Sequence, residues 1–298
     1  MSSHGITPTG IRADRLPRRR AVNRLMELLA WLAAAIAVAI LGVVVWSVAR
    51  RGAGQLNLDL LTKTPVAFSL TPVKQGLANA FAGSLVIVGL ATAMALPVGI
   101  LVAVYLNEFA RPAIRSGVGL VLDVMNGIPT IVIGIFVFGL IVVGRGQSGF
   151  AGAFALSILM LPLVARSTLE VLALVPGSLR EASLALGVPR WRTTLSIVLP
   201  QTIGGIVTGT TLAVARIAGE TAPLLFTSSI VGNNVSWNPH QALQTIPVAI
   251  FELSENPDPT QHARAWAAAL VLLIFILVAS LGARWLATRG RRRLAASR

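Results

Sequence analysis

Residues 178–201 have the sequence SLREASLALGVPRWRTTLSIVLPQ, a polar segment between two long apolar runs of the chain. Ser178 is followed three residues later by Glu181, which is the spacing of a capping box and predicts a short helix over residues 179–186. Gly187 then favours the left-handed backbone that ends a helix. The segment is therefore predicted to begin with a helix and a tight corner.

A second helix is predicted directly after this corner. Pro189 has the fixed φ that suits the first turn of a helix, so the second limb runs over residues 189–199. It leads through Pro200 into the next apolar run. The segment is therefore predicted to fold as helix, corner and helix, with the second limb attached rigidly to a membrane helix.

The composition excludes a soluble globular protein. Hydrophobic residues make up 55% of the chain, charged residues make up 12%, and the mean hydropathy is +0.77, whereas about a quarter of the residues in a soluble domain are charged. The net charge of +14 comes mostly from basic residues at the two ends and in short loops, so no nucleic-acid partner is inferred. There is no cysteine, and His4, His240 and His262 are scattered, so no metal site or cofactor is expected.

Apolar runs predict six membrane-spanning helices, because about 20 apolar residues cross the hydrocarbon core of a bilayer. They lie at residues 28–48, 79–105, 118–143, 150–165, 202–227 and 265–283. A cleaved signal peptide is the alternative for the first run. The apolar core of that run is longer than the roughly 7–15 residues of a signal peptide, so a membrane anchor is preferred. The predicted fold class is an all-α polytopic membrane protein.

Six spans place both termini on one side of the membrane, together with residues 178–201. Most of the 25 Lys and Arg residues fall on that side, which makes it cytoplasmic. Residues 1–27 and 286–298 are then basic cytoplasmic tails, and residues 49–78 form an outer loop. Residues 228–263 form a long outer segment without Lys or Arg.

Charged and polar residues inside two spans indicate a path or an internal lock. Arg216 and Glu220 lie four residues apart, hence on one face of the predicted fifth helix. A charge at the centre of a membrane helix costs about 2.5–3.5 kcal/mol, so the pair either lines a water-filled path or neutralises itself between helices. The third span starts with Asp123 and Asn126, which are tolerable only against protein or water.

The segment 178–201 resembles the coupling loop of ABC importer permeases, whose pattern is E-A-A-x3-G-x9-I-x-L-P. The matching residues are Glu181, Ala182, Ser183, Gly187, Ile197, Leu199 and Pro200. Ser183 stands where the family pattern has its second alanine. The resemblance implies a type I (MetI-like) permease fold over residues 79–285, with this loop seated in a cleft of a separate ATPase. An ordinary amphipathic hairpin between two membrane helices is the alternative.

The stretch RIAGETAPLLF and the preceding LPLVARSTLEVLALVPGSLREA are similar to the phosphate-specific subgroup of these importers, and specifically to the second of its two permease chains. The resemblance implies that Arg216 and Glu220 line the phosphate path and that Arg166 is a second basic station. Arg166 lies near the inner end of a span, where an arginine commonly reaches to the interface instead. Arg166 and Arg216 are expected at different depths, so they would not form one clamp.

The resemblance also implies the partners. They are a second homologous permease chain in a heterodimer, an ATPase dimer, an extracytoplasmic phosphate-binding protein and the lipid bilayer of the bacterial inner membrane. The chain lacks the pattern G-x4-G-K-[ST], so ATP hydrolysis is expected only of a partner and no catalytic residue is assigned. A permease of the same family for sulfate or molybdate is one alternative, and a membrane enzyme or ion channel is another.

Overall fold

The computed structural model describes residues 16–65, 75–230 and 234–296, and all regular structure within these ranges is helical. The expected all-α fold is confirmed. The chain divides into two compact units, Met1–Arg50 and Arg51–Arg298. The first unit holds nearly all of α1 (Leu16–Gly52), which contains the predicted first span at residues 28–48. Much of the predicted basic tail, residues 1–15, lies outside the described residues.

The second unit contains the other helices. Its α-helices are α2 (Leu58–Thr62), α3 (Ala78–Val104), α4 (Pro112–Gly127), α5 (Thr130–Val137), α6 (Gly149–Ala173), α7 (Gly177–Ala185), α8 (Arg190–Thr193), α9 (Leu199–Ile217), α10 (Ala222–Thr227), α11 (Ile246–Glu255) and α12 (Pro259–Ala296). A short 3₁₀-helix is η2 (Ala53–Gln55), and three π-helical segments are η3 (Tyr105–Phe109), η4 (Phe138–Val142) and η5 (Thr194–Val198). The predicted C-terminal tail thus continues α12 through Ala296.

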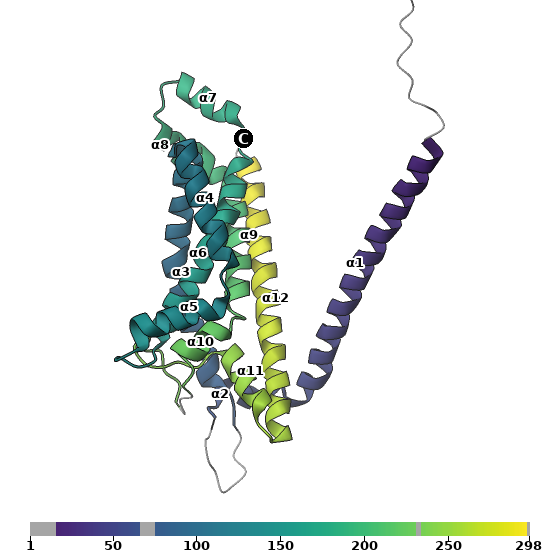
Figure 1. Cartoon of the computed structure of the whole chain (residues 1–298), viewed down its shortest axis with the longest axis vertical. Coiled ribbons are helices and arrows are strands. Elements are labelled where there is room, and N and C mark those ends of the chain that lie inside the picture. The colour runs from purple at the N-terminus through teal and green to yellow at the C-terminus, as the bar shows by residue number, and fades with distance from the viewer. Residues whose placement is uncertain (1–15, 66–74, 231–233, 297–298) are drawn as a thin grey trace, which may run out of the picture. The chain divides into compact units, whose positions relative to one another are not determined.

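Long helices of the second unit run side by side. In Figure 1, α3, α4, α6, α9 and α12 lie along the long axis of this unit, α5 and α10 lie across it near one end, and α7 and α8 cap the other. The C-terminal end of α12 lies at the end of the unit that α7 and α8 occupy (Figure 1). Residues 178–201 and the C-terminal end of α12 therefore lie at the same end of the bundle.

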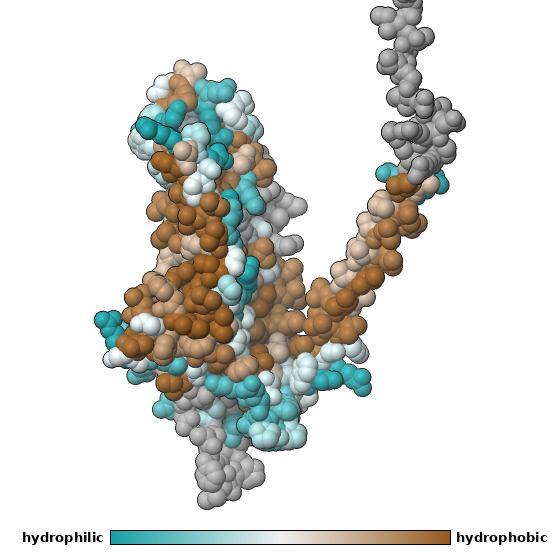
Figure 2. Space-filling view, in the orientation of Figure 1, coloured by the Kyte–Doolittle hydropathy of each residue, from teal (hydrophilic) through white to brown (hydrophobic). Residues whose placement is uncertain are grey.

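The core of the second unit forms around α6. In the most apolar stretch of α6, 61% is buried, against 22–28% in the corresponding stretches of the helices that contain α3, α9 and α12. The helix α6 is therefore the central one. Ile87 of α3, Met160 of α6 and Ile217 of α9 are at most 1% exposed and belong to one cluster. Figure 2 shows a hydrophobic band across the visible face of this unit, between more hydrophilic ends, as a membrane-spanning bundle requires.

Five helical stretches among the described residues are long and apolar enough to cross a membrane, and the pair α4 and α5 makes a sixth if it counts as one span. This pair is bent by 94°. The predicted third span, residues 118–143, is therefore a broken pair of helices and not one continuous helix. Pro129 causes the break, because a proline disfavours helical backbone in the preceding residue, and Ile128 has an extended ψ of 129°.

The predicted fifth span, residues 202–227, is wrong at its far end, whereas the predicted continuation from the second limb 189–199 is present. The helical stretch begins at Arg190 and ends at Ile217, and residues 218–221 separate it from α10. At the far end, Pro223 has no N–H and its ring crowds the carbonyl four residues before it, which favours the break between α9 and α10. At the near end, the π-helical segment η5 lies directly before Pro200 and lets the helix pass this proline.

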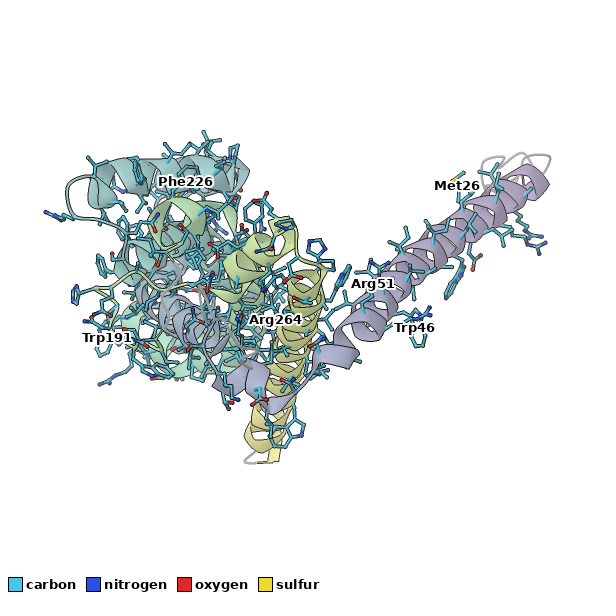
Figure 3. All side chains as sticks on the ribbon, turned by 90° about the horizontal axis from the view of Figure 1, so that it is seen from below. Met26, Trp46, Arg51, Trp191, Phe226 and Arg264 are labelled. Atoms are coloured by element: carbon cyan, nitrogen blue, oxygen red, sulfur yellow. The ribbon has the colours of Figure 1, made fainter. Side chains whose placement is uncertain are left out.

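The outer segment 228–263 is more ordered than the loop that its sequence predicted, because it contains the helix α11. The start of α12 is fastened nearby. Arg264 Nη1 donates to Gln75 Oε1 at 2.6 Å, and the Arg51 guanidinium stacks on Trp266 at 4.9 Å from the ring centroid (Figure 3). These contacts hold this end of the second unit together.

Candidate functional site

Two helix breaks meet in the second unit. The break between α4 and α5 and the break between α9 and α10 line one pocket. The lining residues are Met125, Asn126, Ile128, Thr130, Leu159, Leu163, Arg216, Ile217 and Glu220. The crosswise helices touch behind it, since a Cβ on Gly134 of α5 would lie 2.6 Å from the Cα of Pro223 of α10. Gly134 therefore permits the close approach that brings the two breaks together.

Arg216 and Glu220 share this pocket but not one helix face. Arg216 lies in the last turn of α9, while Glu220 lies in the non-helical break after it, so the predicted four-residue helical pairing is wrong. Within the described residues, neither side chain forms an ion pair or a hydrogen bond. The ion pair that would make Arg216 and Glu220 purely structural is thus not formed, and Arg216 is exposed.

The pocket itself is small. Its volume for water is about 20 Å³, which is room for about one water molecule. Figure 2 shows a hydrophilic stripe across the hydrophobic band, between the positions of α4 and α9 in Figure 1. The exposed side chains of these two helices include Asn126, Thr208 and Arg216. Polar groups at membrane depth face protein or water, so this face of the bundle is not a lipid-facing one.

Arg166 is in a different place. Its Nη2 lies 2.5 Å from Asp123 Oδ2, and the same nitrogen donates to the backbone carbonyl of Gly119, so Arg166 ties α6 to α4. It does not line the pocket that holds Arg216. The sequence had marked both Arg166 and Asp123 as unusual but did not predict that they pair. One donor of this guanidinium, the buried Nε, has no partner among the described residues.

The segment 178–201 folds as two helical limbs with a corner at Gly187. Gly187 has a φ of +73°. Its N–H donates to Leu184 O at 2.9 Å, and the N–H of Val188 donates to Ser183 O at 3.1 Å, which together make a Schellman motif. The predicted left-handed corner is present, and no atom lies within 4 Å of the position of a Cβ at Gly187.

The predicted capping box is wrong. α7 begins at Gly177 with Pro176 as its N-cap residue, and no side chain caps it. The extended backbone of Pro176, with φ −57° and ψ 137°, starts the helix at Gly177, two residues before the predicted start at residue 179. Ser178 therefore lies inside the first turn of α7, where its hydroxyl cannot reach the free N–H groups.

A buried hydrogen bond joins the two limbs. Ser183 Oγ lies 2.8 Å from Thr193 Oγ1, and both residues are at most 4% exposed. The serine at position 183 is thus more than a small residue in a tight space, because its hydroxyl fixes α7 against α8. This bond was not predicted from the sequence, because it depends on how the corner folds.

Arg180 anchors α7 to the membrane helices. Its Nη2 lies 2.8 Å from Oε1 of Glu108, in η3 at the end of α3. Its Nη1 donates to Val175 O at 2.7 Å, and its Nη2 donates to Leu172 O at 3.1 Å, at the end of α6. The Glu108 side chain is only 8% exposed. This ion pair was missed in the sequence, because its members are 72 residues apart.

A polar chain ties α11 to α3 at the other end of the unit. Asn79 Nδ2 donates to Gln244 Oε1 at 3.0 Å, and Gln244 Nε2 donates to Glu252 Oε2 at 2.6 Å. Burial raises the pKa of the Glu252 carboxyl above its usual value, and the hydrogen bond from Gln244 lowers it by less. The folded state therefore favours the protonated carboxyl.

This raised pKa predicts a pH dependence of the stability of α11. The contribution of Glu252 is fully present below the ordinary pKa of 4.5 and is lost as pH rises through the raised pKa. Hydrogen exchange of the α11 amides, corrected for intrinsic rates between about pH 4 and pH 8, should show falling protection. Glu252→Gln should remove this slope, since the amide oxygen still accepts from Gln244. Glu255→Gln, in the exposed last turn, is the matched control. An unchanged slope in Glu252→Gln contradicts the assignment.

Comparison with known proteins adds sequence relatives. A family model described as "Binding-protein-dependent transport system inner membrane component" matches residues 95–292. The chain is 40% identical over 279 residues to "Phosphate transport system permease protein PstA" of Xylella fastidiosa, covering 92% of this chain and 95% of the relative. The protein of the same name from Haemophilus influenzae is 38% identical over 261 residues, covering 87% and 91%. "Phosphate transport system permease protein PstA 1" of Mycobacterium tuberculosis is 43% identical over 225 residues, covering 73% and 72%.

Solved structures share the helical arrangement at low identity. A bacterial alginate ABC transporter, in complex with its alginate-bound periplasmic protein, matches with a TM-score of 0.59 at 17% identity, covering 94% of this chain and 98% of that chain. The MetNI methionine ABC transporter in an inward-facing conformation matches with a TM-score of 0.56 at 18% identity, covering 72% and 93%. At such identities the likeness shows the fold alone.

Proposed function

Because the chain belongs to the family of binding-protein-dependent transport system inner membrane components, we propose that it is a permease subunit of an ATP-driven importer of inorganic phosphate. It has the type I (MetI-like) permease fold that its sequence predicted. The assignment of phosphate as the substrate rests on the 40% identity, over 92% of the chain, to a relative named as a phosphate permease. The chain itself is a non-catalytic transport component.

Arg216 and Glu220 form the anion-selecting part of the proposed path. The Arg216 guanidinium is exposed at the pocket where the helix breaks meet, and its planar fork suits an oxyanion. At neutral pH phosphate still carries a proton, and this O–H donates a hydrogen bond to the Glu220 carboxylate. Sulfate carries none and is repelled. One chain supplies one wall, so a second homologous permease chain completes the path in a heterodimer.

Arg166 is the second basic station of this proposal, and Asp123 controls access to it. The ion pair of Arg166 with Asp123 leaves its Nε without a partner among the described residues. A phosphate ion that reaches Arg166 competes with the Asp123 carboxylate for the same guanidinium. Exchange of these two anions lets Arg166 bind the passing ion weakly, which release into the cell requires.

The two-limbed segment 178–201 is the proposed docking element for an ATPase dimer. Glu181, Ala182 and Gly187 are exposed on it, while Ile197, Leu199 and Pro200 are partly buried where it joins α9. Closure of the ATPases on ATP moves α7 and α8, and the continuous helical stretch Arg190–Ile217 carries that movement to Arg216. Trp191 is 55% exposed beside this surface (Figure 3).

The proposed location is the bacterial inner membrane, with segment 178–201 and both termini in the cytoplasm. The outer segment 228–263 then receives an extracytoplasmic phosphate-binding protein. Its exposed Trp237, which is 60% exposed, and the anchored helix α11 offer a shaped surface for that contact. No nucleic acid takes part.

Substrate-stimulated ATP hydrolysis tests this function. The chain is purified with its second permease and ATPase, placed in nanodiscs and mixed with binding protein in the presence of phosphate, sulfate or molybdate. We expect phosphate to stimulate hydrolysis and the other two oxyanions to leave it at the basal rate. Stimulation by sulfate or molybdate and not by phosphate would show that the substrate is another oxyanion. Failure of any ATPase to co-purify would reject an importer subunit.

Gly187→Val is expected to uncouple the ATPase while the subunit still inserts in the membrane. A β-branched residue at a φ of +73° costs about 1–3 kcal/mol of backbone strain. The site is open, so the cost comes from the backbone and not from a clash. We expect the stimulated rate of ATP hydrolysis to fall several-fold, measured in the same nanodiscs.

Two variants control this experiment. Gly187→Asn should keep most of the stimulated rate, because asparagine tolerates the left-handed conformation. Gly177→Ala, at an open helical position in the same limb, should leave the rate unchanged. Normal coupled hydrolysis in Gly187→Val would contradict the docking role of the corner.

A further inference from the structure

A second pocket lies at the end of the bundle that α7 and α8 cap. Its volume is about 440 Å³. It is lined by Asn107, Glu108, Arg115, Ala173, Arg180, Leu184, Arg190 and Thr193. These residues come from η3, α4, α6, α7 and α8, so the pocket lies between the docking element and the membrane helices. It shares no lining residue with the pocket of Arg216.

The pocket holds three guanidinium groups and one carboxylate. Glu108 is already satisfied, since it accepts from Arg180 and from Asn107 Nδ2 at 2.7 Å. Arg180 uses all its nitrogens on Glu108 and on backbone carbonyls. Arg115 and Arg190 are exposed, and their side chains form no ion pair or hydrogen bond within the described residues. Two positive charges therefore remain uncompensated at the mouth of a polar cavity.

The chemistry of the pocket suits a phosphate group. Two guanidinium forks that converge on one cavity bind a tetrahedral oxyanion through paired, charge-assisted hydrogen bonds. The volume falls in the range of small-molecule sites, roughly 300–1,000 Å³. We propose that Arg115 and Arg190 bind a phosphate group at this place, carried either by inorganic phosphate or by an anionic lipid headgroup. Both sources offer the same anionic oxygens.

Such binding has a structural consequence. Arg115 belongs to α4 and Arg190 begins α8, so one phosphate group bridges a membrane helix and the second limb of the docking element. The Glu108–Arg180 ion pair already joins α3 to α7 on the same pocket wall. The bound group therefore stabilises one position of the docking element against the bundle.

An acidic side chain of a docked protein is the competing occupant. The position of the pocket favours a small anion, because its walls are the inner ends of α3 and α6 and the start of α4 rather than the outward surface of α7. Basic pockets between membrane helices near the interface are typical sites for anionic headgroups.

The test uses the complete importer, with its second permease and ATPase, in nanodiscs. In one arm, binding of radiolabelled inorganic phosphate is measured in phosphatidylcholine nanodiscs, with Arg216→Gln present throughout to remove the transport site. In the other arm, the complex is exposed to vesicles of phosphatidylglycerol or phosphatidylcholine, and retained lipid is measured by native mass spectrometry. The test variant is Arg115→Gln/Arg190→Gln, and the control variant is Arg111→Gln/Arg192→Gln.

We expect the test variant to bind phosphate, or to retain phosphatidylglycerol, about tenfold less than the control variant in at least one arm. The arm that responds identifies the source. Equal binding by both variants in both arms overturns the proposal. Weakened association of the ATPase in the test variant, without loss in either arm, also overturns it and assigns the pocket to an acidic side chain. Because the transport site is removed in the phosphate arm, and the lipid arm does not measure it, failure here leaves the proposed transport function intact.

Discussion

Phosphate uptake through an Arg216→Gln importer is expected to fall at least about tenfold, while the complex still assembles. The Arg216 guanidinium is exposed in the pocket where the two helix breaks meet, and it has no partner within the described residues. A charge-assisted hydrogen bond to phosphate contributes roughly 1.5–3 kcal/mol, and the neutral amide loses the charge. The measurement is the initial rate of radiolabelled phosphate uptake in cells that lack their own phosphate importers.

Further variants separate charge from geometry. Arg216→Lys should retain only part of the rate, because a point charge does not reproduce the planar fork. Glu220→Gln should relax discrimination between phosphate and sulfate, which needs a variant that transports without the binding protein. Arg145→Gln, in the exposed turn before α6, is the matched control for loss of one positive charge. Parental uptake by Arg216→Gln would make this arginine structural and remove it from the path.

The second large effect is expected from Arg180→Gln, which should loosen the docking element. The variant leaves the Glu108 carboxylate, only 8% exposed, without its cationic partner. Removing one partner of a buried ion pair costs about 3–5 kcal/mol. Arg180 is 24% exposed, so water screens this pair in part, and we expect a cost of about 2–3 kcal/mol. We expect phosphate-stimulated ATP hydrolysis to fall by about tenfold or more in nanodiscs.

A double-mutant cycle distinguishes the ion pair from other effects of Arg180. Glu108→Gln/Arg180→Gln removes both charges, so it should recover part of the stimulated rate that Arg180→Gln loses. Arg192→Gln, which removes an exposed arginine of the same element stacked on Trp191, should leave the rate near parental. A double variant as poor as Arg180→Gln would show that the carboxylate is not what the arginine neutralises.

The sequence predicted the corner of segment 178–201 because its chemistry is local. Gly187 adopts a φ of +73° and closes a Schellman motif, which one glycine at that spacing suffices to indicate. The start of α7 was misplaced because Pro176 set it, and the serine and glutamate pattern three residues apart was coincidental. Local signals therefore located the element and its corner but not its first residue.

The helix breaks could not be predicted from proline alone. Pro97 and Pro162 lie inside the continuous helices α3 and α6, whereas Pro129 and Pro223 border breaks. A membrane helix tolerates proline where neighbours satisfy the freed backbone groups, and the neighbours are not visible in one sequence. For this reason Arg216 and Glu220 were correctly singled out as unusual, but their true arrangement across a break was missed.

The two ion pairs could not be predicted from the sequence for a related reason. Asp123 pairs with Arg166 across 43 residues of chain, and Glu108 pairs with Arg180 across 72. Asp123 was singled out from the sequence as a charge inside a span, whereas Glu108 was not. The partner of each carboxylate depends on how α3, α4, α6 and α7 pack, which only the fold supplies.

The central claim is ATP-driven import of phosphate, and accumulation in proteoliposomes tests it most directly. The chain is reconstituted with its second permease and ATPase, ATP is supplied on the side of segment 178–201, and the binding protein and radiolabelled phosphate are supplied on the other. We predict that phosphate accumulates above its external concentration only with ATP, and that labelled sulfate does not accumulate. Accumulation of sulfate but not phosphate, or phosphate entry that is indifferent to ATP, would contradict the claim.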